Sequence, residues 1–549
     1  MNLAAVFLEK GADMEKKKYA GYGAVLLAGI VLLTGCELRN STAKDEGGNK
    51  DIIMETKQEV QEETVLNRLF VNAKDAWVGD IMPFADENGI YLNYLYETDH
   101  NGVAYHPIHR FSTSDLCTYR DDGEILPFGT ELESPDLAIG TGCFLKDREG
   151  KYHCFYTGHN DKAKDLGIAK ECVMHAVSSD NRNWEKVLED TFYAPDSYSS
   201  DDFRDPFVFW NEEEECYWLL IGAKEENKEG SCILNYTSLD LVTWELSGTL
   251  YEQDNLYYME CPDLFKMNRW YYLIFSWNNV TYYRMAESMN GPWIKPEIDT
   301  FDGNAFYAAK TAEYQGKRYL FGFIDRKKNR NDKLGYTWAG SVCPYELVQQ
   351  EDGTLGAKMP TQYEENHFTE KTNWSIAGSR GSIENKNSGI IMKANEEASY
   401  VEFGALPQSM LLSCTVMFRN TAKGAKAGFL FGIEEDALKS YPVSLDLEND
   451  MLCYDGYSEG FDMESDIRNQ QRFDFETDRE YKVNLVVEDE VAVLYMNDEK
   501  VLSNRIYSAI GKKWGLFAQG GEVAFSDITV SLPQPVSSVF PVDKQREMY

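Results

Sequence analysis

The sequence predicts an all-β protein in which a five-bladed β-propeller is followed by a C-terminal antiparallel β-sandwich. Three observations support this fold class. Short runs rich in aromatic and β-branched residues recur at steps of 47 to 65 residues through the first two thirds of the chain of 549 residues. A Ser-Asp-Trp-type signature recurs in three of these units, at 112–119, 178–184 and 238–244. Past residue 360 the pattern changes to strands with alternating polarity.

The repeated unit is defined by five strand-like runs without a helical period, at 90–96, 152–157, 217–222, 271–277 and 318–324. Each run is preceded by another candidate strand, at 80–84, 141–145, 205–209, 260–265 and 305–310. The step between runs is long enough for a four-stranded sheet, and repeated sheets of this size are typical of propeller blades. We therefore expect five blades, over residues 66–360.

The C-terminal part, residues 366–535, has the pattern of a sandwich. Alternating strands are expected at 411–416, 481–487 and 491–496, with a turn at 497–498. Carbohydrate binding by this domain stays open. We favour packing against the propeller, which would stiffen it.

The N-terminal segment, residues 1–36, is predicted to be a lipoprotein signal peptide. Three lysines at 16–18 precede an apolar stretch at 24–33, which ends in Leu-Thr-Gly-Cys at 33–36. Cleavage before Cys36 and lipidation of its thiol would tether the protein outside the bacterial cytoplasmic membrane. A transmembrane anchor is the weaker alternative, because it needs roughly 20 apolar residues. Residues 37–65 are polar and acidic, as expected of a flexible tether.

Three acidic motifs stand at the start of strand candidates in different blades. They are Trp-Val-Gly-Asp at 77–80, Phe-Arg-Asp-Pro at 203–206 and Glu-Cys-Pro-Asp at 260–263. The first strand of each blade lines the propeller axis, so Asp80, Asp205 and Glu260 are expected at equivalent places around one funnel. A solvated surface charge is the ordinary explanation for any one acidic residue, but not for three at matching blade positions.

Composition limits the partners. The formal charge of −37 and pI near 4.6 argue against binding nucleic acid or an anionic membrane surface, and leave membrane contact to the lipid anchor. Neutral carbohydrate suits this charge. The eleven cysteines contain no Cys-x-x-Cys pair and the seven histidines show no ligand spacing, so we expect no metal and no cofactor. The cysteines other than Cys36 are expected to be buried free thiols.

The three acidic motifs resemble the signature motifs of glycoside hydrolase family 32, the invertase, inulinase and levanase family. Further similarities lie at 140–142, 301–303, 306–308, 338–340 and 344–347. The resemblance implies a propeller with a C-terminal sandwich and cleavage of β-fructosidic bonds. Family members usually read Trp-Met-Asn-Asp-Pro-Asn at the first motif, whereas this chain has Gly79, Ile81 and Met82 in place of the amide and proline neighbours. Loss of these amides is expected to open space beside Asp80.

The chemistry of a ketoside assigns roles to the three carboxyl groups. Asp80 is the predicted nucleophile, and Glu260 is the predicted acid/base, its pKa raised by like charge and burial. Retention requires their carboxyl groups to lie about 5–5.5 Å apart. Asp205, held by Arg204, is expected to stay ionised and to stabilise the transition state.

Five residues are predicted to contact the substrate: Arg204, Trp77, Thr141, Tyr307 and Trp338. The alternative for Arg204 is a structural ion pair with Asp205, and the two roles can coexist. For Cys261 we favour a packed thiol without a chemical role.

Two other functions remain open. One is a family 43-like inverting pentosidase, whose carboxyl groups would lie about 6.5–9.5 Å apart. The other is a non-catalytic sugar-binding lipoprotein. Oligomeric state, linkage preference and exo or endo action cannot be inferred from the sequence.

Overall fold

The computed structural model describes residues 64–534, except 99–104, 332–333, 387–388, 395–396, 422–423, 435–438, 456–466 and 508. The predicted signal peptide with Cys36, and all but the last two residues of the predicted tether, lie outside the described residues. Within the described part, no helix has the length and apolar character needed to cross a membrane.

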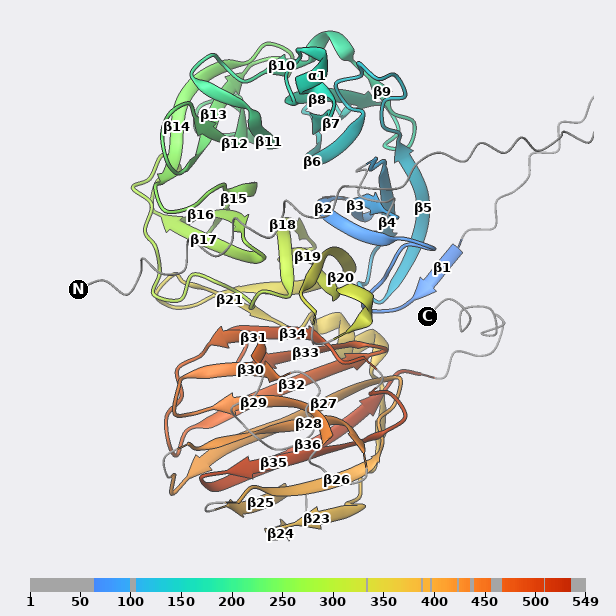
Figure 1. Cartoon of the computed structure of the whole chain (residues 1–549), viewed down its shortest axis with the longest axis vertical. Coiled ribbons are helices and arrows are strands. Elements are labelled where there is room, and N and C mark those ends of the chain that lie inside the picture. Colours follow the sequence, from blue (N-terminus) through green and yellow to red (C-terminus); the bar gives the residue numbers. More distant parts are fainter. Residues whose placement is uncertain are drawn as a thin grey trace, which may run out of the picture. The chain divides into compact units, whose positions relative to one another are not determined.

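The first part of the chain is a five-bladed propeller whose blades are arranged around an axis (Figure 1). Blade one contains β2 (Trp77–Asp86), β3 (Gly89–Glu97), β4 (Ile108–Thr113) and β5 (Thr118–Leu126), with β1 (Thr64–Asn67) paired on β5. Blade two contains β6 (Ala138–Lys146), β7 (Tyr152–His159), β8 (Glu171–Ser178) and β10 (Phe192–Tyr193), with β9 (Glu185–Lys186) paired on β8. Its connections hold the short helices α1 (Ala163–Leu166) and η1 (Leu188–Asp190).

The remaining blades follow in chain order. Blade three contains β11 (Tyr198–Asn211), β12 (Cys216–Glu225), β13 (Ser231–Ser238) and β14 (Glu245–Gln253). Blade four contains β15 (Glu260–Met267), β16 (Trp270–Trp277) and β17 (Val280–Ala286). Blade five contains β18 (Phe306–Tyr314), β19 (Lys317–Lys327), β20 (Tyr336–Gln349) and β21 (Leu355–Lys358), with η2 (Lys328–Arg330) after β19. Nine of the ten predicted blade strands fall within observed strands, and the tenth, at 305–310, begins one residue before β18, so these predictions are confirmed.

Blade four departs from the predicted four strands. Its sheet has three strands among the described residues, and Ile294 and Thr300 add only isolated bridges, to Met285 and Tyr282. Pro292 and Pro296 lie in this segment. Because proline lacks the backbone N–H that a ladder needs, these two residues disfavour a continuous fourth strand there.

The ring closes where the first and last blades meet. Val78 of β2 pairs with Gly340 of β20, and the backbone N–H of Val342 donates to the carbonyl of Val71 at 3.0 Å. These contacts join blades one and five into one sheet.

Each innermost strand carries a β-bulge in which it advances one residue further than its partner. The bulges lie at 79–80 in β2, 141 in β6, 205–206 in β11, 261–262 in β15 and 308–309 in β18. A bulge bends its strand and redirects the neighbouring side chains. All five therefore change side-chain direction at the same level of the propeller.

The C-terminal part is a sandwich of two antiparallel sheets, and η3 (Tyr363–His367) lies between the propeller and these sheets in the sequence. The first sheet contains β22 (Glu370–Thr372), β24 (Ser382–Lys386), β25 (Gly389–Ala394), β27 (Ser409–Arg419), β32 (Glu480–Glu488), β33 (Val491–Met496), β34 (Lys500–Arg505) and β36 (Gly521–Leu532). The second contains β23 (Gly378–Arg380), β26 (Ser399–Ala405), β28 (Lys426–Glu434), β29 (Lys439–Asp446), β30 (Met451–Asp455), β31 (Ile467–Arg472) and β35 (Lys513–Gln519). The three predicted sandwich strands are confirmed.

The sandwich packs against the propeller within one compact unit. Buried Val486, Val493 and Val501 of the sandwich share a hydrophobic core with Tyr345 of blade five. The backbone N–H of Ser503 donates to buried Asp302 at 3.0 Å. These contacts show the expected packing, while stiffening of the propeller by the sandwich stays a prediction.

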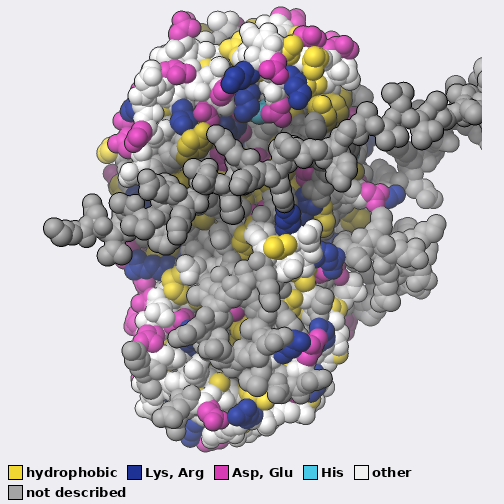
Figure 2. All heavy atoms as spheres, viewed as in Figure 1, with side chains coloured by type: hydrophobic (Ala, Val, Ile, Leu, Met, Phe, Trp, Pro, Cys, Tyr) yellow, Lys and Arg dark blue, Asp and Glu magenta, His cyan; other side chains and the backbone are white. Residues whose placement is uncertain are grey.

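The cysteine expectation also holds in the described part, where ten cysteines are buried and free. On the face shown in Figure 2, acidic, basic and hydrophobic side chains are interspersed.

Candidate active site

The bulges bring the three predicted carboxylates close enough that the charge of Glu260 acts on both Asp80 and Asp205. The thiol of Cys261 lies 3.9 Å from Oδ2 of Asp80 and 3.7 Å from Oδ2 of Asp205. The three carboxyl groups were expected at equivalent strand positions, and this expectation is wrong. Asp80 is the second bulge residue of its strand, Asp205 is the first, and Glu260 immediately precedes its bulge. Because each residue has a different place relative to its bulge, the three carboxyl groups project from different backbone positions.

Asp80 is held by hydrogen bonds at both carboxylate oxygens. Nε1 of Trp338 donates to Oδ1 at 3.0 Å, and the hydroxyl of Thr141 donates to Oδ2. Burial raises the pKa of Asp80 and the charge of Glu260 adds to the rise, whereas the two hydrogen bonds lower it. The bonds therefore fix the orientation of Asp80 and favour its ionised form.

Asp205 is almost completely buried, with 3% of its surface exposed. Its backbone N–H donates to the hydroxyl of Thr157 at 2.8 Å, and its Oδ2 accepts from the N–H of Cys261 at 2.9 Å. Burial, together with the charges of Glu260 and Asp80, raises the pKa of Asp205 to about 7, although Arg204 lowers it. Burial thus opposes the expected ionised form of Asp205, whereas Arg204 and the N–H of Cys261 favour it.

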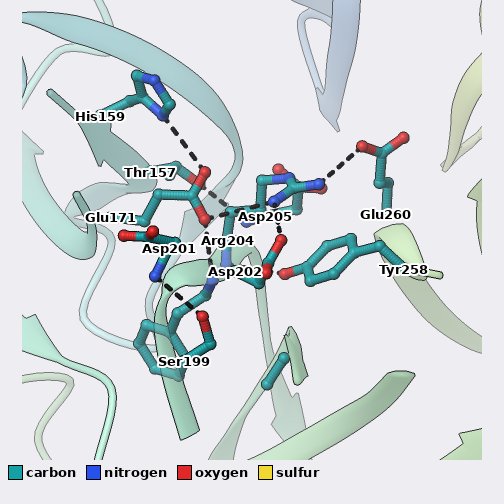
Figure 3. Close-up of polar contacts among 12 residues, drawn as sticks. Thr157, His159, Glu171, Ser199, Asp201, Asp202, Arg204, Asp205, Tyr258 and Glu260 are labelled. Atoms are coloured by element: carbon teal, nitrogen blue, oxygen red, sulfur yellow. Dashed lines mark hydrogen bonds and ion pairs between the residues drawn. The ribbon is translucent and has the colours of Figure 1, made fainter. Parts of the chain in front are cut away.

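The guanidinium of Arg204 pairs with other acidic groups (Figure 3). Nη2 donates to Oε1 of Glu260 at 3.0 Å, and Nη1 lies 3.4 Å from Glu171 and 3.6 Å from Asp202. The ring of Tyr258 lies against it, 3.7 Å from Cζ to the ring centroid. The expected direct ion pair with Asp205 is replaced by these contacts, because the bulge turns neighbouring side chains in different directions.

Glu260 is the most accessible of the three carboxyl groups, with 30% of its side chain exposed. Oε1 accepts from Arg204, and Oε2 accepts from the hydroxyl of Tyr307. Four of the five predicted substrate-contacting residues thus touch a carboxylate of the site: Thr141, Arg204, Tyr307 and Trp338.

Trp77 lies elsewhere. The contacts described for its ring are with the guanidinium groups of Arg326 and Arg505, at 4.9 and 5.9 Å, and none of them reaches the carboxylates. Since side chains alternate along a strand, Trp77 and the bulged residues of β2 do not share one direction.

The space beside Asp80 is filled, contrary to expectation. A Cβ at Gly79 would lie 2.4 Å from Cη2 and 2.5 Å from Cζ2 of Trp338. The indole thus occupies the volume that a larger residue at position 79 would need.

Sequence reasoning missed three residues that support the site: Glu171, Thr157 and Tyr258. Glu171 is 2% exposed, and its Oε2 accepts from the N–H of Phe203 at 2.8 Å. Burial was the distinguishing property, and the sequence does not reveal which of 91 acidic residues are buried. For Tyr258 the sequence does give a weak indication, because this residue is two positions before Glu260.

Of the two described histidines near blade one, His106 lies beside a residue of the site and His109 packs on a tyrosine. The ring of His106 lies 5.0 Å from that of Trp338, and His109 stacks on Tyr96 at 3.9 Å. In the described part of the chain, no three His, Cys, Asp or Glu side chains are grouped as metal ligands. Buried carboxyl groups of raised pKa beside an accessible one are suited to nucleophilic and acid–base chemistry.

Comparison with known proteins supports the same chemistry. The family model "Glycosyl hydrolases family 32 N-terminal domain" matches residues 71–356, and "GH32, BT1760-like, C-terminal domain" matches 353–530. Raffinose invertase of Escherichia coli is 28% identical over 303 residues, which is 49% of this chain and 60% of that protein. Sucrose-6-phosphate hydrolase of Bacillus subtilis is 27% identical over 304 residues, 50% of this chain and 60% of that protein. The match thus spans about 60% of the length of these relatives.

Solved structures share the fold. Fructan 1-exohydrolase IIa from Cichorium intybus superposes with a TM-score of 0.68 at 14% identity, over 84% of this chain and 96% of that one. Exo-inulinase from Aspergillus awamori superposes with a TM-score of 0.64 at 15% identity, over 85% and 97%.

Proposed function

The chain belongs to glycoside hydrolase family 32, and from this premise we propose that it hydrolyses β-fructosidic bonds in fructan, fructooligosaccharide or sucrose-type substrates by a retaining double displacement. The observation that carries the proposal is the convergence of Asp80, Asp205 and Glu260: the thiol of Cys261 contacts both aspartates, and the charge of Glu260 raises the pKa of both. The related raffinose invertase and levanase act on substrates of this kind, as their names state.

In the first step, an oxygen of Asp80 bonds to the anomeric carbon while the bond to the leaving oxygen breaks and Glu260 gives that oxygen its proton. In the second step, water attacks the anomeric carbon, Glu260 accepts the water's proton, and the bond to Asp80 breaks. Asp205 and Arg204 contact sugar hydroxyls and stabilise the charge of the transition state. A pKa of about 7 at Asp205 supports retention of a proton in this coupled set near neutral pH.

The test is activity of two isosteric variants. Asp80→Asn removes the nucleophile and Glu260→Gln removes the proton donor, so each is expected to lower kcat by about 10²–10⁴ with the fold intact. Fructose release from inulin, levan, sucrose and difructosides is the assay, with Glu149→Gln on an exposed turn as the control. Parent-like activity in either variant would remove that residue from its role.

NMR identifies the sugar anomer that is released first, and this anomer distinguishes a retaining from an inverting mechanism. Retention supports Asp80 as nucleophile, while inversion with release of arabinose or xylose supports the pentosidase alternative. Binding of fructosides without turnover by the parent protein supports the non-catalytic alternative.

We also propose an extracytoplasmic location, anchored by lipid on Cys36. The support is the Leu-Thr-Gly-Cys pattern at 33–36 after an apolar stretch. Cys36→Ser is expected to abolish lipid labelling, because only the thiol accepts the diacylglyceryl group. Labelling equal to that of the parent would contradict this proposal.

A further inference from the structure

Gly79 and Trp338 form a complementary pair across the junction of blades one and five. The absence of a side chain at Gly79 leaves room for the six-membered ring of the indole, which would lie 2.4 Å from any Cβ there. The same indole donates from Nε1 to Oδ1 of Asp80 at 3.0 Å. The side chain of Trp338 therefore fills the space at Gly79 and donates a hydrogen bond to Asp80, the predicted nucleophile.

The orientation of the indole is held from two further sides. Its ring packs edge-to-face on Phe323 at 6.2 Å and lies 5.0 Å from His106. The next residue, Ala339, has a φ of 73°, in the left-handed region that is unfavourable for a residue with a side chain. Such a conformation persists only where the surroundings impose it, as at functional sites.

We infer that Trp338, together with Thr141, positions Asp80 in this protein, and that glycine at position 79 is the condition that admits the indole. The inference rests on the proposed role of Asp80 as nucleophile. It replaces the expectation of open space beside Asp80, because any larger side chain at position 79 would displace the indole from Asp80.

The first test is Trp338→Phe, which keeps an aromatic ring and removes the donor. Losing a hydrogen bond to a charged group is expected to lower kcat by about tenfold to a hundredfold. The acidic limb of the kcat/KM profile should move to higher pH, because that bond lowers the pKa of Asp80. KM should change little. A rise in KM alone, with the pH profile unchanged, would overturn the inference and identify Trp338 as a sugar platform. Trp210→Phe, near the end of β11, is the control.

The second test is a double-mutant cycle. Gly79→Ala should lower kcat at least tenfold in the parent and much less in the Trp338→Phe background, since the smaller ring frees the volume. Gly404→Ala, at a glycine with open space around it, is the control. Equal effects of Gly79→Ala in both backgrounds would overturn the pairing. Thermal unfolding of each variant verifies folding.

A third measurement does not depend on activity. In protein labelled with ¹⁵N-tryptophan, the indole N–H signal that disappears in Trp338→Phe should shift with pH in the parent and not in Asp80→Asn. A shift confirms the contact even if no fructoside is cleaved, in which case the proposed function alone fails. A signal that does not respond to pH in the parent contradicts the inference.

Discussion

Asp205 shows how one buried carboxyl group links catalysis to stability. Its ordinary pKa is 3.8, and burial raises the pKa to about 7 in the folded protein. The folded state therefore holds this proton more tightly than the unfolded chain. The contribution of Asp205 to the free energy of unfolding consequently falls as pH rises from about 4 to about 7.

Asp205→Asn should accordingly make the protein more stable and less active. The amide oxygen can still accept from Cys261, but the variant carries no charge to bury. At about 1.4 kcal/mol per pKa unit, the gain in unfolding free energy should reach a few kcal/mol at pH 8 and nearly vanish at pH 4. We expect kcat to fall at least about a hundredfold. Unfolding by urea at the two pH values checks the stability, and a difference that is the same at both would contradict the assignment.

At this scale the sequence predicted residue types better than side-chain directions. The sequence could single out Asp80, Asp205, Glu260 and four contact residues because they lie in short motifs of unusual composition. The fold then brings them together. The position of Arg204 between Glu260 and Glu171 depends on a bulge and on a buried partner far along the chain. Neither can be read from local composition, and the same holds for the indole that fills the space at Gly79.

At the scale of elements, the bulges are the feature that converts a repeated strand into a site. In blades three, four and five, the first bulge residue has a positive φ: 67° at Asp205, 53° at Cys261 and 51° at Ala308. A residue with a side chain pays about 1–2 kcal/mol in this region. These three strained residues lie in the bulges at the level of the propeller where the carboxylates meet.

Two neighbouring alanines allow this strain to be measured. Ala308→Gly should be neutral or stabilising, because glycine adopts a positive φ without a steric penalty. Ala309→Gly, in the same bulge but without a positive φ, should destabilise by about 1 kcal/mol. Both lose one buried methyl group, so thermal unfolding should separate them by on the order of 1–2 kcal/mol. Equal destabilisation would show that Ala308 is not strained.

The blade strands were predictable because aromatic and β-branched residues recur with the period of the repeat. The missing fourth strand of blade four was not, since spacing alone does not weigh Pro292 and Pro296. The bulges were not predicted either. A β-bulge is defined by the register between two paired strands, and the sequence of one strand does not reveal that register.

At the scale of the whole molecule, the propeller and the sandwich are joined by buried polar contacts. Arg505 is 4% exposed, and its guanidinium donates at 2.9 Å to the carbonyls of Ile324 and Asp325 and to the hydroxyl of Ser341. Arg472 also bridges the two domains, through Glu297 at 2.8 Å, but 45% of its side chain is exposed.

These two arginines predict different energetic effects. Arg505→Ala should lower the free energy of unfolding by about 2–4 kcal/mol, because buried carbonyl groups lose their donor. Arg472→Ala should lower it by less than about 1 kcal/mol, as for other exposed ion pairs. Calorimetry should also show two resolved transitions in Arg505→Ala. Similar effects of the two substitutions would indicate that the buried contacts do not couple the domains.

The closure of the propeller has a thermodynamic consequence. The bridge between Val78 and Gly340 joins the ends of the ring within two residues of Asp80 and Trp338. A fructoside that binds only when Trp338 holds Asp80 in place would bind only the closed ring, so its binding energy adds to the free energy of closure, by about 2.7 kcal/mol at a ligand concentration of 100 Kd. We expect this junction, where β2 and β20 pair at one residue, to open before the other blades lose their strands, which would separate Asp80 from Trp338. Heat inactivation should therefore begin below the temperature of global unfolding, and saturating ligand should bring the two temperatures together.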